Sequence, residues 1–217
     1  MASRAHRLSN IELKITSAEQ IPGLTDSNQH IHYYEIAQQL SVNSNVVEVG
    51  CGYGRSTWAW LNAIPEQSNF YVVDNFSMAK ASKMVFNKKT KNRFIDRNIN
   101  QRFNPDIDYL KKYFDGPQKD VFDQIIKQHP KFNLLKDVYP QDFEDWKVTN
   151  KIKFDLAYLD AHHGTEQVAS QLEYFKDCKF ICGDDYKWIS VKVAVDEFTK
   201  QNNYMLTTFD NFYVIKT

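Results

Sequence analysis

Three glycines separated by single residues, Gly50, Gly52 and Gly54, stand between an apolar run and a helical pattern. The run at residues 45–49 predicts a short buried strand, and residues 56–63 predict a helix. Glycine at such a junction allows a sharp turn and lets the backbone approach a ligand without a side-chain clash. The sequence therefore predicts a strand, a glycine-rich loop and a helix, an arrangement typical of nucleotide-type cofactor sites.

The spacing of the loop disfavours a dinucleotide. The dinucleotide motif G-x-G-x-x-G needs a small residue where this chain has Arg55. The chain instead reads acid-x-G-x-G-x-G, with Glu48 as the acid. A second apolar run at residues 70–73 ends at Asp74, about twenty residues beyond the loop, which is the usual spacing of a ribose-binding acid. A carboxylate suits that task because it accepts several hydrogen bonds at once.

Strand and helix patterns alternate through most of the chain. This alternation predicts an α/β fold with a doubly wound, mostly parallel seven-stranded sheet. The last two strands are separated by a short turn at Asp210 and Asn211, so we expect an antiparallel C-terminal hairpin. The seven expected strands are residues 45–49, 70–73, 132–135, 154–159, 179–182, 204–209 and 212–215.

The length of 217 residues suits one domain with a full core. Residues 1–28 are polar and weakly patterned, and we expect a loose lead-in before a single domain at residues 29–217. Residues 75–115 are rich in Lys, Arg and Asn and predict a basic helical insert. As a lid over the cofactor cleft this insert would select an anionic substrate; the alternative is a solvated helical face.

Acids and histidines follow two later strands. Asp160, His162 and His163 follow the strand at residues 154–159, and Asp184 and Asp185 follow the strand at residues 179–182. The carboxyl ends of parallel strands meet at one sheet edge, where ligands of such folds bind. Neighbouring strands lie ~4.8 Å apart, so three carboxylates would crowd together and raise one another's pKa. A hard divalent cation such as Mg²⁺ would relieve that repulsion.

The glycine motif with its two acids resembles the class I S-adenosylmethionine-dependent methyltransferases. The resemblance implies a Rossmann-like fold in which the loop lies against the methionyl part of the cofactor and Asp74 holds the ribose hydroxyls. It places an acid or polar residue for adenine after the third strand, where we expect Asp137. The cofactor-binding residues that it implies are Glu48, Gly50, Cys51, Gly52, Gly54, Asp74 and Asp137.

The later segments resemble a narrower group, the metal-dependent sugar and macrolide O-methyltransferases of the macrocin O-methyltransferase type. The matching stretches are D-A-H-H at residues 160–163 and G-D-D-Y-K-W-I-S-V-K-V-A-V-D-E-F at residues 183–198. The resemblance implies that Asp160, Asp184 and Asp185 hold Mg²⁺ and that His163 is the general base, with Asp160 also counted as catalytic. The implied reaction is O-methylation of a small hydroxylated molecule such as a sugar, nucleotide-sugar or natural product.

Some features leave alternatives open. Thr165 stands where the group has an aromatic residue, and Gln171 stands where it tends to have an acid, so both concern the substrate edge. His162 is an alternative base, and Asp185 could instead cap the following helix. A catechol-type O-methyltransferase, another reaction on the same scaffold and a non-catalytic cofactor-binding module are the alternative functions.

Composition and missing motifs disfavour some binding partners and some cellular compartments. Lys+Arg and Asp+Glu both number 27, so the zero net charge disfavours nonspecific nucleic-acid binding. An Asp/Asn-Pro-Pro-aromatic motif of nucleic-acid amino-methyltransferases is also missing after the fourth strand. Three cysteines without a C-x-x-C pair favour reduced thiols in a cytoplasmic protein. We also expect no signal peptide and no membrane helix.

Overall fold

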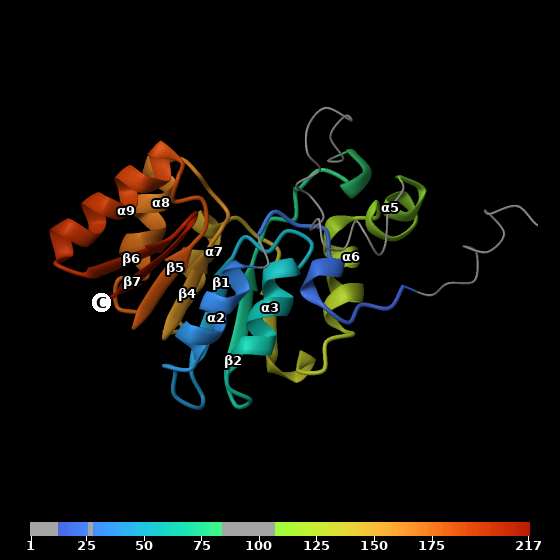
Figure 1. The fold of residues 1–217 in the computed structure, drawn as a ribbon, viewed down its shortest axis with the longest axis horizontal. Helices are drawn as coiled ribbons and strands as arrows, with labels where there is room; N and C mark the ends of the chain where they lie inside the picture. Colours follow the sequence, from blue (N-terminus) through green and yellow to red (C-terminus); the bar gives the residue numbers. More distant parts are fainter. Residues whose placement is uncertain (1–12, 26–27, 84–106) are drawn as a thin grey trace, which may run out of the picture.

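The computed structural model describes residues 13–25, 28–83 and 107–217, and its centre is one seven-stranded sheet (Figure 1). The strand order is β3-β2-β1-β4-β5-β7-β6, and non-consecutive neighbours show the crossovers of a doubly wound sheet. The strands are β1 (Asn45–Val49), β2 (Asn69–Val73), β3 (Leu135–Tyr139), β4 (Leu156–Leu159), β5 (Phe180–Gly183), β6 (Met205–Phe209) and β7 (Phe212–Lys216).

Five strands are parallel, and the C-terminal hairpin is antiparallel. β1 pairs with β2 and β4, β2 with β3, and β4 with β5, all in the parallel sense. β7 runs antiparallel to both β5 and β6. The predicted fold class, a mostly parallel seven-stranded sheet with a closing hairpin, is confirmed. This topology brings the carboxyl ends of β1, β2, β4 and β5 to a single edge.

Helices cover both faces of the sheet. Successive strand residues alternate between two cores: Leu156 and Tyr158 face one, and Ala157 and Leu159 face the other. The first core packs under α2 (Gln29–Ala37), α3 (Arg55–Ala63) and α6 (Gln118–Ile126). The second packs under α7 (Phe143–Thr149), α8 (Thr165–Tyr174) and α9 (Ile189–Asn202), on the opposite side in Figure 1. Burial on both faces explains why the central strands read as continuous apolar runs.

The expected loose lead-in is wrong for the part that the structure describes. Ile15, Ala18 and Ile21 are buried in the first core, and a short helix η1 (Ala18–Gln20) lies between them. The backbone N–H of Ile15 also donates to Gln128 Oε1 at 2.9 Å. Leu13 packs against the same core, and these few apolar side chains among polar neighbours form too sparse a pattern to predict a packed segment. The described part of this segment therefore packs against the first core.

The third strand was predicted too early. Residues 132–134 form a 3₁₀ helix, η3 (Phe132–Leu134), and the strand begins at Leu135. A short apolar run does not distinguish strand from helix by periodicity alone. β3 is an edge strand with Lys136 and Asp137 exposed, so it lacks the apolar continuity of the central strands. Asp137 consequently lies within β3 and not after it.

The basic insert is described only at its ends. A 3₁₀ helix η2 (Ala81–Lys83) and the helix α5 (Ile107–Phe114) flank residues 84–106, which lie outside the described residues. α5 contacts η2, and Leu110 and Phe114 are buried in the first core. In Figure 1 this end of the molecule lies opposite α9. The function of the insert stays a prediction.

Within the described residues, every helix is too short or too polar to cross a membrane.

Candidate functional site

The glycine loop follows β1 and packs directly against the segment after β4. Gly50, Gly52 and Gly54 all have positive φ angles, of 89°, 57° and 95°. Side chains rarely adopt this conformation, so glycine is required by the backbone here. A Cβ on Gly50 would lie 2.6 Å from the backbone carbonyl of Asp160 and from the amide nitrogen of Ala161. The loop and the Asp160 segment are therefore in backbone contact.

Asp74, at the end of β2, holds the loop through backbone amides. Its Oδ2 accepts hydrogen bonds from the N–H groups of Cys51 at 2.8 Å and Gly52 at 3.1 Å. Its Oδ1 accepts one from the N–H of Phe76 at 2.5 Å. The structure thus brings Asp74 to the predicted loop residues.

Gln118 is a loop contact that the sequence analysis missed. Its side chain donates to the carbonyl of Gly52 at 2.7 Å and accepts from the N–H of Met78 at 2.6 Å. Gln118 is buried at the start of α6 and fastens the loop to the chain that follows β2. A lone glutamine at a helix start carries no sequence signal for such a role.

Glu48 is enclosed between β1 and α3. The hydroxyls of Ser56 and Thr57 donate to its two carboxylate oxygens, and the residue has no exposed surface. Burial raises the pKa of Glu48 to about 8, although the two hydroxyl hydrogen bonds act in the opposite direction. These contacts fix the start of α3 against β1. Direct contact of Glu48 with a cofactor stays a prediction.

Asp137 does not occupy the place for which it was selected. It is exposed in the middle of β3, where its Oδ1 accepts the N–H of Val138 at 2.8 Å. The acid that follows β3 is Asp142, whose Oδ1 accepts from the Asn75 side chain at 2.9 Å. Because Asn75 follows Asp74, Asp142 lies at the same sheet edge as the loop. Because β3 begins at Leu135 and ends at Tyr139, the acid beyond its carboxyl end is Asp142 and not Asp137.

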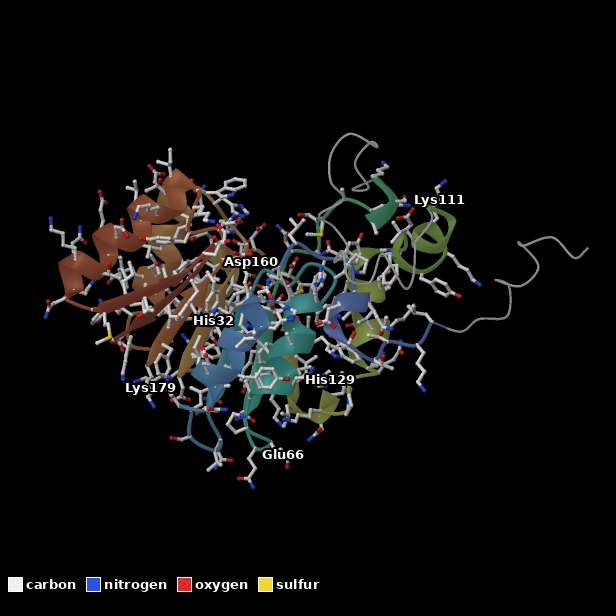
Figure 2. All side chains as sticks on the ribbon, viewed as in Figure 1. His32, Glu66, Lys111, His129, Asp160 and Lys179 are labelled. Atoms are coloured by element: carbon white, nitrogen blue, oxygen red, sulfur yellow. The ribbon has the colours of Figure 1, made fainter. Side chains whose placement is uncertain are left out.

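Asp160, His163 and Asp185 form the second half of the site. One possible metal-ligating atom from each lies within 4.8 Å of the others. His163 Nε2 lies 2.5 Å from Asp185 Oδ2. β4 and β5 are neighbours, with Leu159 opposite Gly183, so the residues after both strands meet. Figure 2 shows Asp160 at the sheet edge opposite to Glu66 and Lys179.

Asp184 is more buried than this three-residue group and has hydrogen-bond partners of its own. Its Oδ1 accepts from Gln29 Nε2, Asn211 Nδ2 and the backbone N–H of Asp185, each at 2.8 Å. Asp184 is buried, and within the described residues it is not part of the three-residue group. The structure brings Asp160 and Asp185 together as predicted, and His163 joins them in place of Asp184. The role of Asp184 as a metal ligand stays a prediction.

Burial and mutual repulsion shift the pKa values of the carboxyl groups in the site. Burial, followed by the charges of Asp184 and Asp185, raises the pKa of Asp160 well above its usual range. Burial also raises the pKa of Asp184 to about 6. For Asp185 burial acts upward, but the hydrogen bonds from His163 and Asn211 outweigh it and lower the pKa. The hydrogen bond to Asp185 raises the pKa of His163 above its ordinary value.

No protein-family model matches the chain, and no curated protein matches it. Solved structures do. The O-methyltransferase TomG from Streptomyces achromogenes, in complex with SAM, has a TM-score of 0.58 at 9% identity over 98% of this chain and 94% of that one. The O-methyltransferase from Bacillus cereus, in complex with SAH, has a TM-score of 0.54 at 11% identity. That match covers 98% of this chain and 96% of the other. The chain has the class I methyltransferase fold.

A methyltransferase from Geobacter sulfurreducens shares this fold, with a TM-score of 0.57 at 12% identity over 89% of this chain and 79% of that one. At identities this low, the structural similarity establishes the methyltransferase fold alone. The chemistry has to be inferred from the residues of the site. The resemblance seen in the glycine motif is thereby confirmed for the fold. The loop, Asp74 and the Asp160 group all lie at the edge where open α/β sheets bind ligands.

Two open interpretations from the sequence are settled by the start of α9 and by α8. α9 begins at Ile189 with Trp188 at the N-cap position, so Asp185 is not its cap. Gln171 is buried in α8, so it does not lie at an open substrate edge. Thr165 is nearer the site, since its hydroxyl donates to the carbonyl of Ser190 at 3.2 Å.

An exposed aromatic residue adjoins His163. Trp188 is 55% exposed, and the centre of its ring system lies 4.6 Å from the centre of the His163 imidazole. The hydroxyl of Ser190 donates to the backbone carbonyl of His163. His163 is therefore held by Asp185 at its ring and by α9 at its backbone. His162 is not part of the three-residue group within the described residues.

Proposed function

We propose that this protein is an S-adenosylmethionine-dependent O-methyltransferase that acts on a small hydroxylated molecule with the help of a divalent cation. The observation that carries the proposal is the backbone contact between Gly50 and Asp160. It joins a loop suited to the cofactor to a cluster suited to deprotonating an acceptor. Methyl transfer needs those two groups side by side.

The cofactor would lie on the glycine loop. Gly50, Gly52 and Gly54 leave the loop backbone open to a ligand, and Asp74 would accept the ribose hydroxyls. Cys51 would contribute its backbone, and Glu48 would act indirectly by fixing α3. For the adenine contact we propose Asp142, the acid that follows β3. The remaining contacts with the cofactor would come from the backbone of the glycine loop.

The donor set around Asp160 fits a hard divalent cation. The largest charge effects on Asp160 come from other carboxylates, and its partial burial makes an isolated charge costly. Asp160 and Asp185 would hold the ion, with Asp184 as the third predicted ligand; Mg²⁺ prefers such oxygen donors. When bound, the cofactor supplies a methyl group on a sulfonium and the cation lowers the pKa of an acceptor hydroxyl.

His163 would take the proton. Its Nε2 is engaged by Asp185, which leaves Nδ1 as the nitrogen for the acceptor hydroxyl. Nδ1 of His163 would accept the proton of the acceptor hydroxyl, so that the acceptor oxygen could take the methyl group that the cofactor would supply, with the thioether as the leaving group. Asp185 stabilises the imidazolium that results, and Trp188 covers one side of the ring. No covalent enzyme intermediate is required, so positioning and electrostatics supply most of the rate.

A second candidate is the same transfer without a metal. The close contact between His163 and Asp185 favours it, because an imidazole oriented by a carboxylate is a competent base. Such a site would suit an acidic hydroxyl, for example a phenol. A catechol would still fit the metal-dependent version.

Calorimetry and a methyl-transfer assay test the proposal together. We expect S-adenosylmethionine to bind with and without Mg²⁺, because the loop does not depend on the cluster. Transfer of a labelled methyl group should then be screened over sugars, nucleotide-sugars and catechols, with Mg²⁺ and with EDTA. Transfer abolished by EDTA supports the metal-dependent reaction, and transfer that persists in EDTA supports the second candidate.

Two results would overturn these proposals. Absence of cofactor binding at millimolar concentration would remove the methyltransferase function altogether. Cofactor binding with no transfer to any acceptor class would favour the non-catalytic module.

A further inference from the structure

The turn between β6 and β7 reaches the acidic residues after β5. The sequence marks Asp210 and Asn211 only as residues of a hairpin turn. In the fold, β7 pairs with β5, with Gly183 opposite Tyr213, so the turn stands beside residues 184–187. The Asn211 side chain therefore meets the cluster from the opposite side to His163.

One amide group serves both acids. Asn211 Nδ2 donates to Asp184 Oδ1 at 2.8 Å and to Asp185 Oδ1 at 2.9 Å. An amide nitrogen carries two N–H groups, so each carboxylate can receive its own hydrogen. Asn211 is thus a bridge between two neighbouring carboxylates that would otherwise repel each other.

The rest of Asn211 fastens the same loop. Its Oδ1 accepts from the N–H of Lys187 at 3.1 Å, and its backbone carbonyl accepts from the N–H of Tyr186 at 2.8 Å. Together with the two amide bonds, these contacts hold residues 184–187 along their length. They also support the left-handed backbone of Asp185, whose φ is 62°.

We propose that Asn211 is a positioning residue of the cation and base centre, an inference that rests on the proposed function. Asp185 is held at Oδ1 by Asn211 and at Oδ2 by His163, so its rotamer is fixed. Asp184 is held at Oδ1 by Asn211 and by Gln29, which leaves Oδ2 as its remaining oxygen. Asn211 therefore occupies Oδ1 of both acids and fixes the orientation of the two carboxylates relative to each other.

A neutral amide suits this task better than a charged group. A lysine or arginine at position 211 would neutralise the acids and compete with a cation for them. An aspartate would add a third repelling charge to the pair. The amide offers donors without a full charge, so the acids remain available to a divalent ion.

The test is Mn²⁺ binding, measured by electron paramagnetic resonance and calorimetry in the full-length protein without acceptor. We expect Asn211→Ala to weaken Mn²⁺ binding by about 10- to 100-fold, the usual effect of removing an outer partner of metal ligands. Asn211→Ser, which keeps a single donor, should fall between Asn211→Ala and the wild type. S-adenosylmethionine affinity should be unchanged in both variants, because the loop is held by other residues.

Asp210→Asn is the matched control. It changes the same turn and removes only the exposed ion pair with Lys187. Asparagine tolerates the left-handed conformation of position 210, where φ is 55°. We expect Mn²⁺ affinity within about twofold of the wild type, because no acid of the cluster loses a partner.

The possible failures are distinguishable. If the wild type binds Mn²⁺ and both Asn211 variants bind it equally well, the role of Asn211 is overturned and the proposed function stands. If the wild type binds no Mn²⁺ at all, the cation site is overturned, and the role of Asn211 with it. Should Asn211→Ala lose S-adenosylmethionine binding through misfolding, Asn211→Ser decides by the same comparison.

Discussion

The two halves of the candidate site are built on different principles. Asp74, in the glycine-loop half, accepts three backbone N–H groups, from Cys51, Gly52 and Phe76. Among the described residues, the Asp160 carboxylate accepts one long contact, from the Tyr158 hydroxyl at 3.3 Å, and burial followed by the neighbouring carboxylates raises its pKa. The loop is therefore stable as it stands, whereas the acidic half is electrostatically incomplete. A cation would complete it.

The difference predicts that the halves respond separately to most substitutions. Contacts in the loop half should control cofactor affinity, and contacts in the acidic half should control turnover and metal affinity. Gly50 is the exception, because it touches both halves. The following substitutions test that division, beginning with the largest expected effect.

Asp160→Ala should abolish turnover while leaving the loop half intact. Loss of charge stabilisation worth several kcal/mol predicts at least about a thousandfold fall in kcat/KM. S-adenosylmethionine affinity should stay within about threefold, because Asp160 meets the loop only through its backbone. Calorimetry and the methyl-transfer assay check both values. Glu166→Ala, an exposed acid on α8, is the control, and equal activity in Asp160→Ala would refute the assignment.

Gly50→Ala should damage both halves at once. The added methyl would lie 2.6 Å from the Asp160 backbone in a conformation that side chains rarely adopt. We expect a loss of about 1–3 kcal/mol in the free energy of unfolding, with weaker binding of both cofactor and metal. Urea unfolding measures the first effect. Gly116→Ala is the control, because its nearest neighbour would be Val121 Cγ2 at an ordinary 3.4 Å.

Asp74→Ala should weaken cofactor binding and leave metal binding unchanged. Hydrogen bonds to a charged group contribute about 1.5–3 kcal/mol, so S-adenosylmethionine affinity should fall by about 10- to 100-fold. Mn²⁺ affinity should not change. Glu66→Ala, an exposed acid in the turn before β2, is the control and should leave S-adenosylmethionine affinity unchanged. A parallel loss of Mn²⁺ binding in Asp74→Ala would show that the halves are not independent.

Glu48→Gln should change the pH dependence of stability and little else. The pKa of Glu48 rises from 4.5 to about 8 in the folded protein, so the folded state retains a proton that the unfolded state loses. Its contribution to stability is full below pH 4.5 and declines as the pH rises toward about 8. Glutamine does not titrate, so unfolding midpoints of the variant should decline less across this interval. Identical pH profiles for both proteins would contradict the buried protonated acid.

Much of the fold could be predicted because buried parallel strands are continuous apolar runs. The central strands β1, β2, β4 and β5 and the hairpin were placed within a few residues. The edge strand β3 was misplaced, because its exposed Lys136 and Asp137 interrupt the pattern. The lead-in was misjudged, because its contacts with the core join residues far apart in the chain.

The sequence by itself determined the sheet, the glycine loop and the residue types at the carboxyl ends of the strands. These depend on local periodicity, backbone conformation and strand order, all of which a chain encodes over short spans. Only the tertiary structure decided which side chains meet. The contacts of Gln118 with Gly52, of Asn211 with both aspartates and of Asn75 with Asp142 join residues from different elements. Such contacts follow from the packing of helices and turns around the sheet, and no local pattern records them.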